Sequence, residues 1–241
     1  MRPRIPDGEV TYAIGDTHGR SDLLSQLLEQ IQHDAQKADA PTKTLIFLGD
    51  YVDRGPDSRG VIDILSGGLP DGFGAIFLKG NHEQLMLDFL ADASWLGPWC
   101  RNGGEQTLRS YGVNFDRLEH DRAPPDMFRE EFARALPARH LAFFNALKLY
   151  HVVGDYAFVH AGLRPGVALE AQSPNDLIWI RGPFLDALDP FEKMVVHGHT
   201  PEAEPVIRAH RIGIDTGAVF SGRLTAVRLF QEGQEFLQTA V

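Results

Sequence analysis

Residues 44–55 have the sequence TLIFLGDYVDRG, and this stretch determines the expected fold more than any other part of the chain. Residues 44–48 form a short apolar run with the length of a buried strand. The loop at 49–55 carries two aspartates and an arginine, and residues 61–65 continue with apolar side chains at helical spacing until the glycine pair 67–68. The stretch therefore predicts a strand, a polar loop and a short helix.

The same order of strand, loop and helix occurs on both sides of this stretch. Residues 10–14 are apolar, and apolar side chains at 23–31 lie on one helical face. Residues 75–78 form a third apolar run, and residues 85–90 a third helical pattern. Open α/β sheets place their ligands at the carboxyl ends of strands, so the three polar loops are expected to converge. The sequence thus predicts an α/β fold.

The rest of the chain predicts a helical segment and further strands. Residues 94–147 spread aromatic side chains among charges, with Pro124-Pro125 and Pro137 as breaks. This segment is expected to be mostly helical, to pack over the sheet edge and to use its aromatics as core. Further strands are expected at 156–159, 194–196, 212–214 and 223–230, the last two joined as a hairpin through the glycine-bounded residues 217–222.

Length and composition predict one domain over residues 1–241. A chain with 43% hydrophobic residues can bury a core, and neither an internal repeat nor a Gly/Ser-rich linker divides it. The formal net charge of -10 and the pI near 5.4 argue against general nucleic-acid or anionic-membrane partners, which need a basic face. A phosphate ligand would need positive charge supplied locally.

The single cysteine and the N-terminus indicate the compartment. Cys100 has no cysteine partner in the chain, which excludes an intrachain disulfide and fits a reducing environment. Residues 1–7 lack the apolar centre of a signal peptide, and no stretch approaches the length of a membrane span. We therefore expect a cytoplasmic protein without a membrane partner. The oligomeric state is left open by these features.

Five short clusters carry the residue types that bind divalent ions, each beside a glycine at the expected end of a strand. Aspartate, histidine and asparagine supply the mixed oxygen and nitrogen donors that transition ions accept. A lone Gly-Asp pair is ordinary turn chemistry, but a turn needs none of the histidines. The clusters are GDTHG at 15–19, GDYVDRG at 49–55, GNHE at 80–83, HAG at 160–162 and GHT at 198–200.

The clusters predict two metal ions that share one carboxylate. Asp16 and His18 stand two apart, so in extended backbone both side chains point to the same side and one ion can take both. Asp50 can bridge that ion to a second one with its two oxygens. A water held between two ions roughly 3.5–4 Å apart loses its proton near neutral pH and can attack phosphorus in line. The second ion would be completed by Asn81, His160 and His199.

The neighbouring residues predict a proton donor and a set of phosphate-binding side chains. His82 can protonate the leaving alkoxide if Asp53 orients its ring and favours its charged form. Arg54 can hold phosphate oxygens with its planar fork, Asn81 can contact the same phosphate, and Arg181 is a second candidate arginine.

Two residues near these motifs are expected to play structural parts. His197 stands two before a predicted ligand, but the adjoining apolar residues 195–196 favour a structural or supporting histidine. Cys100 is expected to pack rather than to react.

These motifs resemble the calcineurin-like metallophosphoesterases, and within them the phosphoprotein phosphatase (PPP) family in its bacterial and phage-type serine/threonine phosphatase branch. The resemblance covers most of the chain, and the run IDTGAVF at 214–220 adds to it. It implies two facing mixed β-sheets flanked by helices, and two divalent ions with Mn²⁺ as the usual activator and Fe, Zn, Ni or Co as alternatives. Pro201 stands where many other superfamily members have a further metal-binding histidine, which agrees with the PPP pattern.

The resemblance also assigns roles to individual residues. It gives the first metal Asp16, His18 and Asp50, the second metal Asp50, Asn81, His160 and His199, proton donation His82 with Asp53, and phosphate binding Arg54 and Arg181.

Three functions are compatible with these motifs. The resemblance implies a metal-dependent phosphomonoesterase acting on phosphoserine, phosphothreonine and also phosphotyrosine, with a phosphorylated protein or peptide as its partner. A hydrolase of dinucleoside polyphosphates shares the fold and metals, but its symmetrical relatives tend to lack Asp53 and to carry aspartate in place of Glu83. A non-catalytic phosphopeptide-binding protein is disfavoured because every expected ligand is present. The sequence of residues 94–147 is not mapped onto a eukaryotic phosphatase by this resemblance, so the substrate stays open. The native metal is also left open by the sequence.

Overall fold

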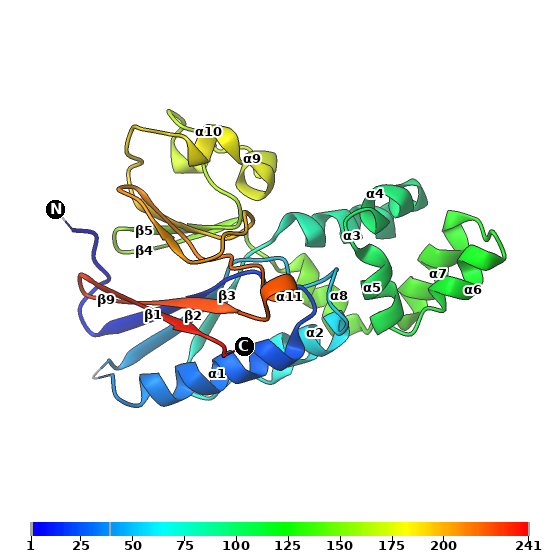
Figure 1. The fold of residues 1–241 in the computed structure, drawn as a ribbon, viewed down its shortest axis with the longest axis horizontal. Coiled ribbons are helices and arrows are strands. Elements are labelled where there is room, and N and C mark those ends of the chain that lie inside the picture. Colours follow the sequence, from blue (N-terminus) through cyan, green and yellow to red (C-terminus); the bar gives the residue numbers. More distant parts are fainter. Residues whose placement is uncertain (1, 39, 241) are drawn as a thin grey trace.

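Two five-stranded mixed sheets pack face to face in the computed structural model, which describes residues 2–38 and 40–240 (Figure 1). The first sheet has the order β10-β9-β1-β2-β3, and the second has the order β4-β5-β6-β8-β7. The first is built from β1 (Glu9–Ile14), β2 (Thr42–Phe47), β3 (Gly74–Phe77), β9 (Thr225–Phe230) and β10 (Gly233–Gln238). The second is built from β4 (Tyr150–Val153), β5 (Tyr156–Val159), β6 (Met194–His197), β7 (Val206–Ile207) and β8 (Arg211–Gly213).

Helices cover the outer face of each sheet, as the resemblance implied. The buried leucines of α1 (Ser21–Ala35) pack with Tyr12 and Ile14 of β1, together with α2 (Ser58–Gly67). On the other side, α9 (Pro174–Trp179) and α10 (Gly182–Leu185) pack over β5 and β6. The space between the sheets is filled by a separate apolar cluster that includes Ala13, Ile46 and Val196. The predicted fold class is confirmed.

The register of the first sheet brings the polar loops to one level. Strands β1, β2 and β3 are parallel, and their last residues pair in a row, Ile14 with Phe47 and Phe47 with Phe77. In the second sheet β5, β6 and β8 are also parallel, with Phe158 opposite Val196. The loops that follow these strands therefore begin side by side, which is the geometric basis of a shared site.

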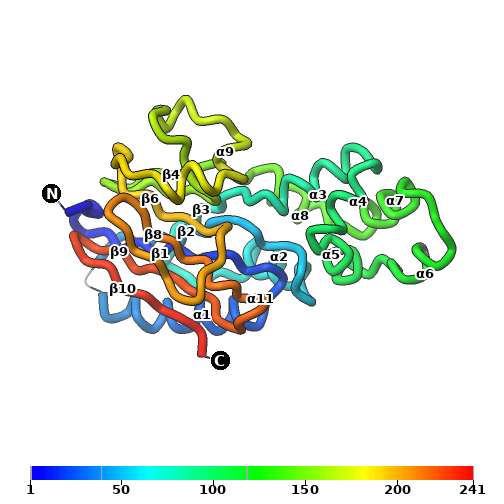
Figure 2. Tube along the Cα trace, turned by 45° about the horizontal axis from the view of Figure 1, so that its top comes forward, coloured from blue at the N-terminus to red at the C-terminus, as the bar shows by residue number. Residues whose placement is uncertain are grey.

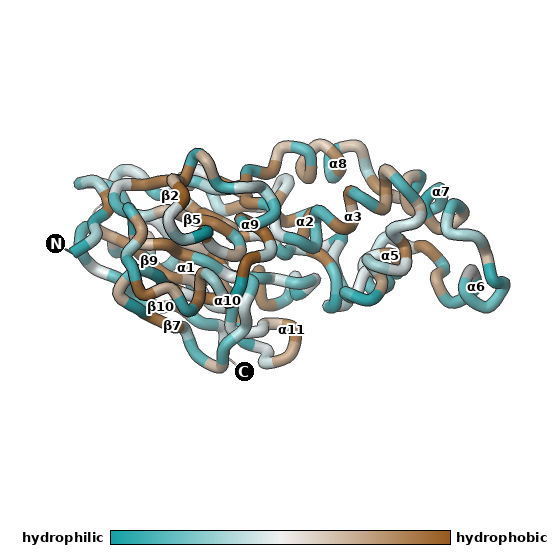
Figure 3. The backbone as a smooth tube through the Cα atoms, turned by 90° about the horizontal axis from the view of Figure 1, so that it is seen from above, coloured by the Kyte–Doolittle hydropathy of each residue, from teal (hydrophilic) through white to brown (hydrophobic). Residues whose placement is uncertain are grey.

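The predicted helical segment projects from one end of the sandwich (Figure 2). It packs against α2 through α5 and α8 and against α3 through the helices that follow it. Of these helices α8 also lies against the edge strand β3, with the Phe143 and Phe77 ring centroids 4.9 Å apart. The expectation that the segment lies over the sheet edge is therefore correct for α8 and wrong for the projecting helices before it. Its outermost helix, α6, is mostly hydrophilic (Figure 3). The segment continues α3 (Asn81–Ala91) with η1 (Ala93–Trp95), α4 (Leu96–Cys100), α5 (Gly104–Ser110), α6 (Phe115–His120), α7 (Pro125–Ala135) and α8 (Ala138–Asn145).

The expected hairpin at the C-terminus is also wrong, although its strands exist. Strand β8 belongs to the second sheet and β9 to the first, so the chain crosses between the sheets here. Gly217 and Gly222 have φ of 65° and 72° and bracket a single helical turn, α11 (Ala218–Ser221). Two left-handed glycines close a helical turn as readily as a hairpin, and packing decided between them. The sequence reasoning also missed β4, β7 and β10.

The sequence predicted no membrane-spanning segment, and the helices of the structure can be compared with the length and hydropathy that such a segment needs. Within the described parts of the chain, no helix is long and apolar enough to cross a bilayer.

Candidate metal and phosphate site

The five predicted clusters meet where the strands of both sheets end. Asp16 and His18 follow β1, Asp50 follows β2, and Asn81 opens α3 directly after β3. From the second sheet, His160 follows β5 and His199 follows β6. All six side chains are at least 95% buried, with exposed fractions between 0% and 5%. The sequence therefore identified a group of polar residues that the fold buries together.

Two of the flanking glycines are required by close approach. A Cβ atom on Gly80 would lie 2.1 Å from Asp50 Oδ1, and one on Gly198 would lie 2.0 Å from Asp16 Oδ1. Any side chain at either position would displace a predicted ligand.

Backbone strain is concentrated at the same place. Of the non-glycine residues with left-handed φ, five lie in these loops: His18, Asp50, Asp53, Arg54 and His199, with φ between 43° and 72°. Each such residue costs about 1–3 kcal/mol and persists only where its surroundings hold it, which is typical of functional sites.

Asp50 lies between two groups of ligand atoms. One group is formed by His18, Asp50 and His82 and the other by Asp50, His160 and His199, and within each the ligand atoms lie within 4.8 Å of one another. His18 Nε2 is 3.5 Å from Asp50 Oδ2, whereas His160 Nε2 is 3.4 Å from Asp50 Oδ1. The two carboxylate oxygens thus face different histidines, as a bridging ligand requires.

Asp16 and Asn81 adjoin these groups without belonging to either. Asp16 Oδ2 accepts a hydrogen bond from the His199 backbone N–H at 3.0 Å. The side-chain oxygen of Asn81 lies 3.0 Å from His160 Nε2.

Backbone carbonyls fix which histidine nitrogen faces the centre. His18 Nδ1 donates to the Val52 carbonyl and His160 Nδ1 donates to the Leu48 carbonyl, each at 2.9 Å. Both rings therefore present Nε2 inward, an orientation typical of metal-binding histidines. Two buried acceptors, Asp16 Oδ1 and His199 Nε2, have no hydrogen-bond partner among the described residues. Such orphaned atoms fit a cation as their missing partner.

The electrostatics of the site also fit bound cations. Burial raises the pKa of Asp16 well above its usual value, and the nearby carboxylates of Asp215 and Asp50 raise it further. Burial lowers the pKa of His18 to about 3 and that of His199 to about 2, with neighbouring histidines adding to both shifts. These rings are therefore neutral at pH 7, the form in which imidazole binds metal. Closely spaced carboxylates and neutral imidazoles are together the donor groups that a divalent ion binds.

His82 and Asp53 form the predicted pair. His82 Nδ1 donates to Asp53 Oδ2 at 2.8 Å, and both side chains are fully buried. Burial alone would lower the pKa of His82, but the charge of Asp50 and the hydrogen bond and charge of Asp53 outweigh it, so the pKa is raised. Asp53 therefore favours the charged form of the ring, although in this arrangement His82 Nε2 accepts from Arg54 Nη2 at 2.9 Å.

The two predicted phosphate-binding arginines lie near different histidines of the centre. Arg54 is half-buried, with Nη1 2.9 Å from His18 Nε2 and Nη2 2.9 Å from His82 Nε2. Arg181 is exposed at the start of α10, and its charge contributes to lowering the pKa of His199. Both guanidinium groups are thus near the centre, and Arg54 already contacts it.

The structure adds Trp99 and Thr107, which sequence reasoning treated only as part of a helical segment. Trp99 Nε1 donates to both oxygens of Asp53, at 3.0 and 2.9 Å, and Thr107 Oγ1 donates to Asp53 Oδ1 at 2.6 Å. The signal for this contact was the glycine pair Gly103-Gly104 inside a helical segment, which marks a close approach of backbone.

Glu83 is a third residue whose structural part was missed. Its carboxylate accepts backbone N–H groups from Asp50, Tyr51 and Gly80 at 2.9, 2.7 and 2.9 Å, and from Val52 at 3.3 Å. Burial and the charge of Asp50 raise the pKa of Glu83 to about 7, although the backbone donors lower it. The side chain joins the loop after β2 to the loop after β3.

His197 is outside both groups of ligand atoms, in agreement with the expectation of a supporting histidine. Its Nδ1 donates to the Gly198 carbonyl at 3.0 Å and its Nε2 accepts from Arg211 at 3.2 Å.

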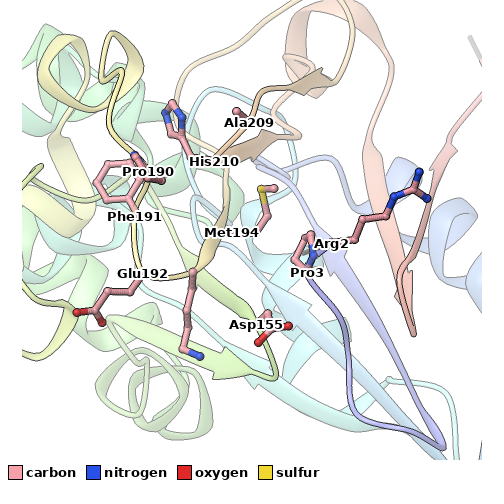
Figure 4. A pocket seen from close by; sticks show the side chains of 10 residues that line it. Arg2, Pro3, Asp155, Pro190, Phe191, Glu192, Met194, Ala209 and His210 are labelled. Carbon is pink, nitrogen blue, oxygen red and sulfur yellow. The ribbon is translucent and has the colours of Figure 1, made fainter.

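A cavity opens beside the centre. It has a volume of about 530 Å³ and lies between α3, η1 and α9. The ring of Trp179 in its wall contacts the ring of His199 edge-on, with centroids 6.1 Å apart, and Trp95 in the opposite element is 39% exposed. Its remaining lining residues are Gln84, Leu85, Asp88, Pro174, Asn175 and Ile178. A separate hollow, between the N-terminus and the segment before β6, contains none of the predicted ligands (Figure 4).

Comparison with known proteins gives one family. Residues 10–222 match the sequence profile of the calcineurin-like phosphoesterases. Among curated relatives, the asymmetrical bis(5'-nucleosyl)-tetraphosphatase PrpE of Bacillus thuringiensis (strain Al Hakam) is 26% identical, over 89% of this chain and 88% of the relative. Serine/threonine-protein phosphatase 1 of Salmonella typhimurium is 29% identical, over 90% and 91%.

Solved structures show the same fold. A crystal structure provisionally described as a diadenosine tetraphosphatase has a TM-score of 0.67 at 19% identity and covers 100% of this chain and 99% of its own. A cold-active protein tyrosine phosphatase has a TM-score of 0.58 at 17% identity, with 97% and 81% covered.

Proposed function

Because the chain belongs to the calcineurin-like phosphoesterase family, we propose that it is a metal-dependent phosphomonoesterase that removes phosphate from serine and threonine side chains, and also from tyrosine, in phosphorylated proteins or peptides. The observation that carries this proposal is the buried His82–Asp53 pair, 2.8 Å apart and beside Asp50. A serine or threonine alkoxide is a poor leaving group that needs a proton, whereas a nucleotide released from a polyphosphate leaves as a stable anion. A proton donor is thus of most use to a phosphomonoesterase.

The metal ions are part of the proposal. Two divalent ions, with Mn²⁺ proposed as the activating one, would supply Lewis-acid charge and lower the pKa of water at the site. The residues that would hold them are Asp16, His18, Asp50, Asn81, His160 and His199, whose donor types, neutral rings and orphaned atoms fit such ions.

The remaining residues bind the phosphate and move the proton. Arg54 and Arg181 would hold phosphate oxygens by charge-assisted hydrogen bonds, and Asn81 would donate its amide to the same group. If Arg54 moved from His82 Nε2 to the phosphate, Nε2 would be free to take up a proton from water, and His82 would then donate this proton to the leaving oxygen. Asp53 stabilises the imidazolium through Nδ1. Cys100, the single cysteine, supports a cytoplasmic location for the protein.

A side-by-side hydrolysis assay tests the proposal. Metal-free protein reloaded with Mn²⁺ is given a phosphothreonine peptide and diadenosine tetraphosphate at equal concentrations, and Asp50→Asn serves as the control for metal-dependent turnover. We expect a higher kcat/KM for the peptide and at least about a 100-fold loss in the variant, since even residues that only support metal ligands cost 10–100-fold. A preference for the dinucleotide would overturn the assignment, and full activity of the variant would overturn the metal mechanism.

Hydrolysis of dinucleoside polyphosphates is the second candidate function. The Trp95 and Trp179 rings in the cavity beside His199 favour it, because indole rings stack on nucleobases, at about 1–3 kcal/mol per base. The names of the Bacillus relatives point the same way.

A further inference from the structure

The carboxylate of Asp53 is held from three directions. His82 approaches Oδ2 from α3, Trp99 approaches both oxygens from α4, and Thr107 approaches Oδ1 from α5. Because the indole N–H is shared between the two oxygens at 3.0 and 2.9 Å, the plane of the carboxylate is fixed as well as its position. Two of the three donors come from the projecting helical segment, which no motif of the site had included.

The hydroxyl of Thr107 has all of its hydrogen bonds committed. It has one proton, which it donates to Asp53 Oδ1 at 2.6 Å, so Ser58 must be the donor in the contact between the two hydroxyls at 3.0 Å. Thr107 Oγ1 also accepts the backbone N–H of Asp53 at 2.9 Å. Thr107 Oγ1 therefore binds both the side chain and the backbone N–H of Asp53.

The same segment supports the strained backbone next to the pair. Asp53 and Arg54 are consecutive residues with left-handed φ of 72° and 66°. The Arg54 N–H donates to the Gly103 carbonyl at 3.2 Å, and a Cβ on Gly103 would come within 2.8 Å of the Arg54 backbone nitrogen. A strained pair of this kind needs outside support to persist, and residues 99–107 supply it.

Trp99 is itself immobilised. It is 0% exposed, and its ring packs on Phe89 and Phe132 with centroids 5.0 and 5.5 Å apart. A Cβ on Gly104 would lie 2.5 Å from the indole, so the neighbouring backbone closes its remaining side. Phe89 belongs to α3, the helix that carries His82 near its start. The donor and the acceptor of the His82–Asp53 bond are thus tied to one aromatic cluster.

We propose that Trp99 and Thr107 are positioning residues for proton donation, acting through Asp53 to aim His82 at the leaving group. The inference rests on the proposed phosphomonoesterase function. It gives the helical segment a part in the chemistry, because the segment fixes the direction of the proton donor while the strand loops hold the metals. If these residues were merely structural, replacing them would lower the turnover of all substrates alike. If they are positioning residues, replacing them lowers the turnover of those substrates whose leaving group needs the proton.

The test compares leaving groups in the Mn²⁺-loaded full chain. Thr107→Val removes the hydroxyl and keeps the shape, Thr107→Ser restores the hydroxyl, and Trp99→Phe removes the indole N–H. Thr11→Val is the matched control, since Thr11 is equally buried and its hydroxyl has no hydrogen-bond partner in the described structure. Turnover is measured on 4-nitrophenyl phosphate, which has a good leaving group, and on a phosphothreonine peptide and an alkyl phosphate, which have poor ones.

We expect Thr107→Val and Trp99→Phe to lower kcat for the poor leaving groups about 10- to 100-fold, the effect of losing one hydrogen bond to a charged group. On 4-nitrophenyl phosphate kcat should change less than about twofold, and KM should stay the same for all three substrates. Thr107→Ser and Thr11→Val should behave as the wild type.

Equal losses on good and poor leaving groups in Thr107→Val, with Thr107→Ser restored, would overturn the inference. If the Trp99→Phe variant does not fold, the comparison of Thr107→Val with Thr107→Ser alone tests the inference. His82→Asn separates this inference from the proposed function. If His82→Asn selectively slows poor leaving groups and Thr107→Val does not, only the inference fails. If His82→Asn slows all substrates equally, proton donation by His82 is wrong and the inference is overturned with it.

Discussion

At the scale of single residues, the centre combines buried acids with histidines that the fold keeps neutral. Asp16 and His199 each leave a buried polar atom without a partner, and Asp50 turns one oxygen to each side. This arrangement is costly in a chain without cations, because buried charges need pairing. It is favourable once divalent ions are bound.

His197 makes a prediction about acid stability. Burial lowers its pKa to about 3, and its hydrogen bonds to the Gly198 carbonyl and Arg211 suit the neutral ring. A histidine with a depressed folded-state pKa contributes stability above its unfolded pKa of 6.5, and this is lost as pH falls towards 3 at about 1.4 kcal/mol per pH unit. Between pH 6.5 and 5, the free energy of unfolding should fall about 2 kcal/mol more in the wild type than in His197→Gln.

Urea unfolding at several pH values, without added metal, measures this difference. Glutamine can still accept from Arg211, so the fold should persist. Identical pH slopes in the two proteins would show that His197 is not the group responsible.

At the scale of elements, the site depends on how loops are joined. Asp50 lies after β2 and Asn81 after β3, and the carboxylate of Glu83 accepts backbone N–H groups from both loops. Parallel pairing brings the loops to one level, and Glu83 then fixes their distance. The start of α3 at Asn81 thus carries both a predicted metal ligand and, at Glu83, the bracing contact.

Replacing Glu83 with glutamine should destabilise the protein. One of its two accepting oxygens becomes an NH₂ group facing backbone donors, and the loss should be about 3 kcal/mol in the free energy of unfolding. Denaturant unfolding at pH 8 measures the loss, with Glu235→Gln as an exposed control that should cost less than about 1 kcal/mol. A Glu83→Gln variant as stable as this control would show that the bracing contact is dispensable.

Replacing Trp95 tests whether the cavity between α3, η1 and α9 binds a nucleobase. If its exposed ring stacks on a base, Trp95→Ala should raise KM for diadenosine tetraphosphate about 10-fold, since one stacking contact contributes about 1–3 kcal/mol. The kcat/KM for a phosphothreonine peptide should change less than about twofold. Steady-state kinetics on both substrates decide the matter, and an unchanged KM for the dinucleotide would exclude Trp95 as a stacking platform.

At the scale of the whole molecule, the centre lies where two sheets and the projecting helical segment meet. The predicted ligands come from both sheets, and support for Asp53 comes from the helical segment. Binding of ions at this junction should therefore stabilise the entire fold rather than one loop.

Metal loading should raise the free energy of unfolding. An ion that binds only the folded state adds about 2.7 kcal/mol at a concentration of 100 times its Kd. Thermal and denaturant unfolding with chelator and with increasing Mn²⁺ measure the increment, and Asp50→Asn should remove most of it. A wild type whose stability does not respond to Mn²⁺ would contradict the predicted metal site.

The sequence by itself determined the strand, loop and helix order of residues 10–90 and which polar residues cluster where those strands end. Both depend on local patterns, because an apolar run followed by a glycine and polar ligands marks the end of a strand. Local patterns do not report which sheet a strand joins. Strand β9 therefore appeared to form a hairpin with β8, whereas packing between two apolar sheet faces placed them in different sheets.

Only the tertiary structure decided what surrounds the predicted residues. Trp99 and Thr107 lie 46 and 54 positions from Asp53, and no spacing in the chain connects them. Their hydrogen bonds arise because the projecting helical segment folds back on the loop after β2 and buries its aromatic cluster against α3. Coordination chemistry depends on residue types, which the sequence contains, while the aim of a proton donor depends on contacts that exist only after the chain has packed.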